Sequence, residues 1–78
     1  SAASDVYKRQ VYLEALRYHA VNLILIHNHP SGYPEPSDAD INLTRQFRRA
    51  TSFFDIRLLD HVIIGDGEFA SLNKNGLV

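Results

Sequence analysis

The sequence predicts an α/β domain whose elements follow the order helix, strand, helix, strand, strand. Residues 21–26 form a short run that is apolar except at Asn22, which is typical of a strand buried on both faces of a sheet. Apolar residues recur at helical spacing before and after this run. Alternation of helices and strands over so short a chain favours strands packed against helices around a single core.

The first predicted helix spans residues 11–20, where Tyr12, Ala15, Leu16 and His19 follow the i, i+3, i+4, i+7 pattern. After the apolar run, residues 30–36 contain all three prolines and Gly32, so we predict a turn-rich loop.

A second helix is predicted from residue 38 to about residue 54. Leu43, Phe47, Ala50 and Phe54 form one apolar stripe at helical spacing. Residues 58–65 and 69–72 are the remaining predicted strands, and the Asp-Gly pair at 66–67 predicts a hairpin turn between them.

Residues 1–10 show no apolar period and no helix cap. They equal, residue for residue, one reading frame of a widely used sequencing-library transposon adapter. We therefore predict that 1–10 is a non-native tail and that 11–78 is the natural sequence. An ordinary disordered N-terminus is the alternative. Because the run 21–26 is too apolar for a comfortable edge strand, we also expect 11–78 to be the C-terminal part of a larger sheet domain.

Composition excludes several classes of protein. The formal charge of −1 argues against a general nucleic-acid binder, and we expect Arg45, Arg48 and Arg49 to form a solvated helix face. The chain has no cysteine, so a disulfide framework and a thiolate zinc site are both excluded. It has no apolar stretch long enough to span a bilayer and no visible signal peptide, which makes the cytoplasm the default location.

The chemistry-bearing residues gather where the buried strand ends. His27 and His29 are two residues apart, so in a strand their side chains point to the same face. Asp40 follows eleven residues after His29, in the first turn of the second predicted helix. Two imidazoles and one carboxylate are the protein ligands of a catalytic zinc ion, which keeps its fourth position for water.

The spacing His-x-His, seven residues, Ser-x-x-Asp resembles the metal-binding motif of the JAMM (MPN-domain) metalloproteases. The segments HNHPSG at 27–32 and LDHVIIG at 59–65 are similar to the RadC branch of that superfamily. The resemblance implies an incomplete MPN sandwich, Zn2+ held by His27, His29 and Asp40, and a catalytic hydroxyl at Ser37 that supports the polarised carbonyl. It also implies peptide or isopeptide substrates.

Each part of this motif has a simpler interpretation. Ser37 and Asp40 also form a Ser-x-x-Asp pattern that caps a helix, and Ser37 can serve both roles. A His-x-His pair alone is weak, because histidines fill many structural positions. His19 and His61 are predicted to be structural, His19 by packing or by pointing to the C-terminus of its helix.

The sequence departs from the family pattern in one respect. JAMM enzymes take a catalytic glutamate from a strand upstream of the His-x-His, separated from it by a helix. Glu14 lies inside that helix, and Glu35 and Glu68 follow the histidines, so none matches. We expect the parent protein to be a zinc-dependent hydrolase and this chain to be inactive. The alternative is a non-catalytic module that binds metal or is associated with DNA repair. Substrate, nucleic-acid contact and oligomeric state stay open.

Overall fold

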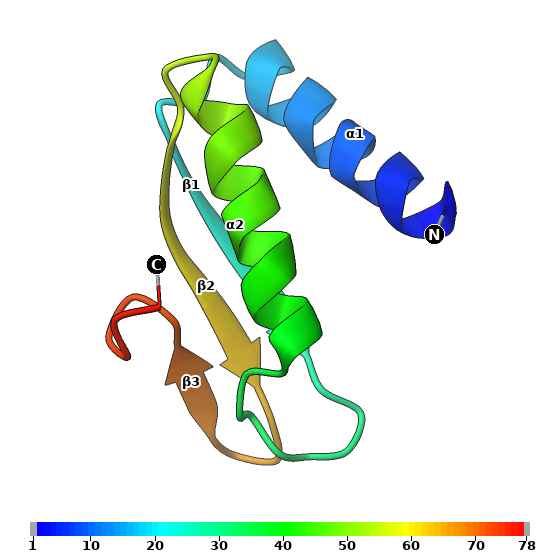
Figure 1. Ribbon diagram of the computed structural model, residues 1–78, viewed down its shortest axis with the longest axis vertical. Coiled ribbons are helices and arrows are strands. Elements are labelled where there is room, and N and C mark those ends of the chain that lie inside the picture. The colour runs from blue at the N-terminus through cyan, green and yellow to red at the C-terminus, as the bar shows by residue number, and fades with distance from the viewer. Residues whose placement is uncertain (1, 78) are drawn as a thin grey trace.

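The computed structural model describes residues 2–77, with side chains from Tyr7 onward. Its elements are α1 (Ala2–Arg17), β1 (Asn22–Asn28), α2 (Asp38–Ser52), β2 (Arg57–Ile64) and β3 (Phe69–Ser71), as Figure 1 shows. The predicted α/β class and the predicted order of elements are confirmed. None of the helices in the described part of the chain is long and apolar enough to cross a membrane.

The three strands form one mixed sheet in the order β1-β2-β3. β1 and β2 are parallel, with His27 opposite Ile63, and α2 makes the crossover that a parallel pair requires. β2 and β3 are antiparallel and are joined at the predicted Asp-Gly turn, where the Gly65 N–H donates to the Glu68 carbonyl at 2.9 Å. The crossover places the C-terminal end of β1 beside the N-terminal end of α2 (Figure 1).

The core lies between α2 and one face of the sheet, where Phe47, Leu58, Ile63 and Leu72 are buried. The predicted apolar stripe of α2 is only partly correct. Phe47 is buried, but the helix ends at Ser52 and Phe54 is 53% exposed beyond it.

Two threonines of α2 that the predicted apolar stripe did not include lie at the interface between the helix and the sheet. Thr44 and Thr51 are buried, and each hydroxyl donates to the carbonyl one turn earlier in the helix, at 2.7 and 2.8 Å. A hydroxyl that is hydrogen-bonded within its own helix can be buried without the cost of an unpaired polar group. These positions therefore pack against the sheet although they are polar.

The prediction that residues 21–26 form a strand buried on both faces is wrong for the described part of the chain. Exposed and half-buried residues alternate along β1, and Ile24 and Ile26 are 52% and 68% exposed. The reason is that α2 covers only one face of the sheet, and that β1 is an edge strand among the described residues.

α1 begins well before the predicted residue 11, as one continuous helix from Ala2. Extending an existing helix into neighbouring residues costs little, since nucleation is the expensive step. Within α1, Ala15 is buried and the Tyr12 ring lies 4.9 Å from that of Phe47. His19 does not pack on the helix: it is exposed two residues after the helix end, with a left-handed φ of 54°.

Candidate metal centre

The end of β1 presents two imidazoles to the same side of the sheet. His27 belongs to the strand and His29 follows its last residue, and their ring centroids lie 4.8 Å apart at a steep angle of 82°. The His27 side chain is 41% exposed and that of His29 is 15% exposed. The spacing of two residues thus brings both rings to one point, with one side open to solvent.

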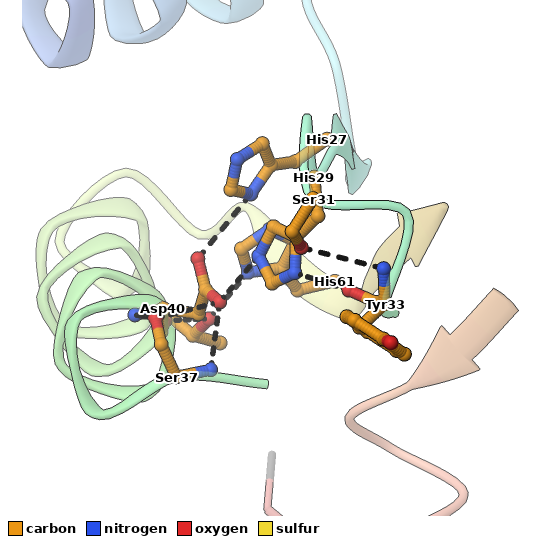
Figure 2. A network of polar contacts seen from close by, with 8 residues as sticks. His27, His29, Ser31, Tyr33, Ser37, Asp40 and His61 are labelled. Atoms are coloured by element: carbon orange, nitrogen blue, oxygen red, sulfur yellow. Dashed lines mark hydrogen bonds and ion pairs between the residues drawn. The ribbon is translucent and has the colours of Figure 1, made fainter. Parts of the chain in front are cut away.

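Asp40 enters the same point from α2. Its Oδ2 atom lies 2.8 Å from Nε2 of His29, and its Oδ1 atom lies 3.3 Å from Nδ1 of His27. Figure 2 shows the carboxylate directed toward both rings. One ligand atom from each of the three residues falls within 4.8 Å of the others. The structure therefore brings together the three side chains that the sequence singled out as metal ligands.

His29 is oriented by the loop that follows it. Its Nδ1 atom lies 2.8 Å from the carbonyl oxygen of Tyr33. A carbonyl only accepts hydrogen bonds, so Nδ1 carries the hydrogen and Nε2 faces the site. The Tyr33 N–H donates in turn to the Ser31 hydroxyl at 3.3 Å. A backbone carbonyl that fixes the orientation of an imidazole is the usual outer support of a metal-binding histidine.

The loop that follows His29 contacts the turn between β2 and β3 through backbone hydrogen bonds. The His29 N–H donates to the Ile64 carbonyl at 2.9 Å, and the Asp66 N–H donates to the Gly32 carbonyl at 2.8 Å. A Cβ atom at Gly65 would lie only 2.3 Å from the Gly32 oxygen. Gly65 is therefore required by close approach of two backbones, a role that the sequence did not reveal because the contact joins segments 33 residues apart.

Ser37 is the N-cap of α2, and the capping interpretation of Ser37 and Asp40 is confirmed. The Asp40 N–H donates to the Ser37 hydroxyl at 3.1 Å, while the Ser37 N–H and hydroxyl both donate to Oδ2 of Asp40 at 2.8 Å. One carboxylate thus completes the helix cap and faces the two histidines.

These bonds also set the charge of Asp40. Burial alone raises the pKa of its carboxyl, but hydrogen bonds from Ser37 and His29 outweigh burial and hold the pKa below its usual value. The group is a carboxylate at neutral pH, which is the form that binds a cation.

His61 lies beside this cluster and was not predicted there. It is 1% exposed, its Nδ1 atom is 2.6 Å from the Thr44 hydroxyl, and its ring stacks on that of His27 with centroids 5.9 Å apart. Burial lowers its pKa more than the nearby Asp40 and Asp60 carboxylates raise it. The strand register that pairs His61 with Leu25 decides this position. The LDHVIIG segment at 59–65 contains His61 and resembled the RadC branch, but its spacing gave no reason to place His61 beside His27.

A cavity of about 290 Å³ opens beside His27 and His61. Its other walls are mainly apolar and come from α1, β1 and α2; they are formed by Tyr7, Lys8, Val11, Leu25, Ile26, Leu43 and Phe47. The candidate metal centre therefore borders an apolar hollow on one side and solvent on the other.

The other charged residues considered as functional candidates lie away from the cluster of His27, His29 and Asp40. Glu14 pairs with Arg17 at 3.7 Å on the exposed side of α1, and Glu35 and Glu68 are exposed. No glutamate belongs to the group of converging ligands found among the described residues. The arginines of α2 at 45, 48 and 49 are exposed, as a solvated helix face requires.

In this α/β domain, two histidines at the end of a strand and an aspartate at the start of a helix converge. Such an arrangement is typical of a domain with a metal site. The chain belongs to the RadC-like JAB domain family, whose model matches residues 1–77. The resemblance seen in the sequence is thereby confirmed. The match includes residues 1–10, and their interpretation as an adapter-derived tail stays a prediction.

Individual relatives agree with the family assignment. A UPF0758 protein of Clostridium acetobutylicum is 49% identical over 76 residues, which is 97% of this chain and 33% of that protein. A UPF0758 protein of Marinomonas sp. is 53% identical over 76 residues, again 97% of this chain and 34% of the relative. The chain thus spans about a third of the length of the curated relatives it matches.

Proposed function

We propose that His27, His29 and Asp40 hold a zinc ion and that the protein is a metal-dependent hydrolase of peptide or isopeptide bonds. The convergence of the three side chains from β1, the following loop and α2 is the observation that supports this proposal. Two imidazoles and a carboxylate suit zinc and leave a position open. When bound, zinc supplies a Lewis acid that polarises a carbonyl and makes water nucleophilic near neutral pH.

The protein residues around that position have separate tasks. Asp40 contributes negative charge, and the Tyr33 carbonyl keeps Nε2 of His29 directed at the site. The Ser37 hydroxyl is adjacent, at the positive end of the α2 dipole. In the described geometry it donates to Asp40, so stabilising a substrate oxygen requires the hydroxyl to turn away from the carboxylate.

The described residues place no glutamate at the site to accept a proton from water. Loss of a general base typically lowers a rate about 10²–10⁴-fold. This observation favours a second candidate for the chain taken alone, namely a metal-binding module without turnover. Hydrolysis by the whole protein then requires a base from residues other than those described here.

Zinc affinity tests the proposed ligands. In competition with a chromogenic chelator, His27→Ala, His29→Ala and Asp40→Ala should each bind zinc far more weakly than the parent chain, because each removes one of three ligands. His19→Asn is the matched control, since His19 is exposed, lies outside the cluster, and asparagine tolerates its left-handed φ of 54°. Equal zinc affinity in the parent and all three ligand variants would contradict the site.

Hydrolysis is tested separately with peptide and isopeptide substrates, with and without a chelator. We expect the 78-residue chain with zinc to show no chelator-sensitive cleavage, because no glutamate of the described residues joins the converging ligands as a general base. Cleavage that disappears in Asp40→Ala would reveal a base within this chain. Glu14 and Glu35 would then be the first residues to replace.

A further inference from the structure

We propose that His61 and Thr44 are positioning residues of the metal centre, and that they hold Asp40 and His27 in place from the core side. The proposal rests on the zinc site proposed above and extends it to two residues that do not themselves converge on the metal position. It is carried by a chain of buried contacts that joins β2 to α2 and β1.

The first link joins His61 to Asp40. The Thr44 hydroxyl donates its hydrogen to the Asp40 carbonyl at 2.7 Å, so its lone pairs are left to accept. Nδ1 of His61 lies 2.6 Å from that hydroxyl and is therefore the donor of the second bond. Both side chains are almost fully buried, at 0% and 1% exposure, so water does not compete for these bonds. The chain of bonds ties the first turn of α2, which carries Asp40, to the middle of the sheet.

The second link joins His61 to His27. Their rings stack at 27° with centroids 5.9 Å apart, and both line the apolar cavity beside the site. His27 makes the longer of the two contacts with Asp40, 3.3 Å, and its side chain is the more exposed. The Tyr33 carbonyl orients His29 from outside the cluster, whereas the polar contact of the His27 ring is the one with Asp40 itself. The buried ring of His61 is therefore the aromatic neighbour that supports the His27 ring from the core side.

A purely structural role for His61 is the competing explanation. An apolar side chain would fill a buried position between a helix and a sheet at lower cost, because a buried imidazole must keep a partner. Here the partner is a threonine whose own hydroxyl is bonded to the backbone of a proposed ligand. The hydrogen bonds of His61 and Thr44 therefore support the position of a proposed metal ligand, a role that packing alone would not require.

Helix α2 offers a matched pair of variants for the test. Thr44→Val and Thr51→Val both remove a buried hydroxyl that bonds one turn back in the same helix. Only Thr44 connects to His61 and Asp40. We expect Thr44→Val to lose more thermal stability than Thr51→Val, because it also leaves the buried Nδ1–H of His61 without a partner. In the folded protein, zinc affinity should fall about 10–100-fold in Thr44→Val alone, as is typical when the outer support of a metal ligand is removed.

His61→Phe keeps a ring against His27 but cannot donate to Thr44, so its zinc affinity should fall as in Thr44→Val. The double variant with Thr44→Val and His61→Phe should lose no more zinc affinity than either single variant, because both substitutions break the same hydrogen bond. The Co2+-substituted protein should also change its visible absorption in these variants and not in Thr51→Val. All measurements use the complete 78-residue chain.

Equal zinc affinity in Thr44→Val and Thr51→Val would overturn the proposal and leave the zinc site intact. If instead His27→Ala and Asp40→Ala bind zinc as the parent does, the site itself fails and this inference falls with it.

Discussion

Asp60 shows how a single carboxylate can join three segments outside the candidate site. It accepts hydrogen bonds from the His61 N–H at 2.8 Å, from the Asn73 N–H at 2.9 Å and from the Ser71 hydroxyl. Burial alone raises the pKa of Asp60, but these bonds outweigh burial and hold the pKa below its usual value. The carboxylate fastens β3 and the residues after it to the strand that carries His61.

The lowered pKa of Asp60 predicts how stability depends on pH. Since the folded state binds this proton more weakly than the unfolded state, the contribution of Asp60 is complete above the unfolded pKa of about 3.9 and is lost as pH falls through the lower folded pKa. Asp60→Asn should therefore cost about 1–3 kcal/mol at pH 7. The difference from the parent should shrink below about pH 4.

Urea unfolding at a series of pH values measures this difference. Asp66→Asn is a suitable control, because Asp66 is an exposed aspartate in the turn before β3. A stability difference for Asp60→Asn that stays constant down to pH 2 would contradict the assignment of the effect to the charged carboxylate.

At the scale of elements, the geometry of the site depends on how the 29–34 loop sits on the β2–β3 turn. Gly65→Ala places a methyl group where the Gly32 carbonyl and Pro34 now lie, 2.3 and 2.9 Å from the new Cβ. The backbone has to shift, which should cost about 1–3 kcal/mol and move His29 away from Asp40. We expect zinc affinity to fall together with stability.

Gly67→Ala is the control that separates the loss of stability from the loss of zinc affinity. Gly67 has a left-handed φ of 70° and nothing within 4 Å of an added Cβ, so alanine there introduces backbone strain without a clash. Zinc competition should show a loss in Gly65→Ala and none in Gly67→Ala. The same zinc affinity in both would mean that the loop adjusts without displacing His29.

At the scale of the whole molecule, the two faces of the sheet differ. α2 covers the face that carries His27, His61 and Ile63, and Ile63 is fully buried. On the opposite face Ile24 and Ile26 are exposed in β1, and Phe69 of β3 is 68% exposed. The free energy gained from apolar burial therefore comes from one side of the sheet.

Ile63→Val and Ile26→Val test this asymmetry with the same chemical change. Removing one buried methylene at Ile63 should cost about 0.5–1.5 kcal/mol. The change at Ile26, 68% exposed, should stay within about 0.5 kcal/mol. Denaturant midpoints of the two variants give the comparison. Equal losses would show that the outer face of β1 is covered in solution.

Several features followed from local sequence alone. The order of the elements, the turn between β2 and β3, the cap of α2 and the common direction of His27 and His29 all depend on spacings of a few residues. Such patterns act through the backbone geometry of one strand, one turn or one helix end. The predicted ends of β2 differ from the observed ends by a single residue.

Other features depended on pairing between distant segments. The parallel register places His61 against His27, the crossover turns Thr44 and Thr51 toward the sheet, and the close backbone contact at Gly65 seats the loop of His29. The single covering helix leaves Ile26 exposed, although its apolar neighbours predicted burial. Local sequence determined which residues are candidate metal ligands and in which order the elements come. Only the tertiary structure decided which polar groups support the site, because burial and register arise from contacts between elements that spacing along the chain does not encode.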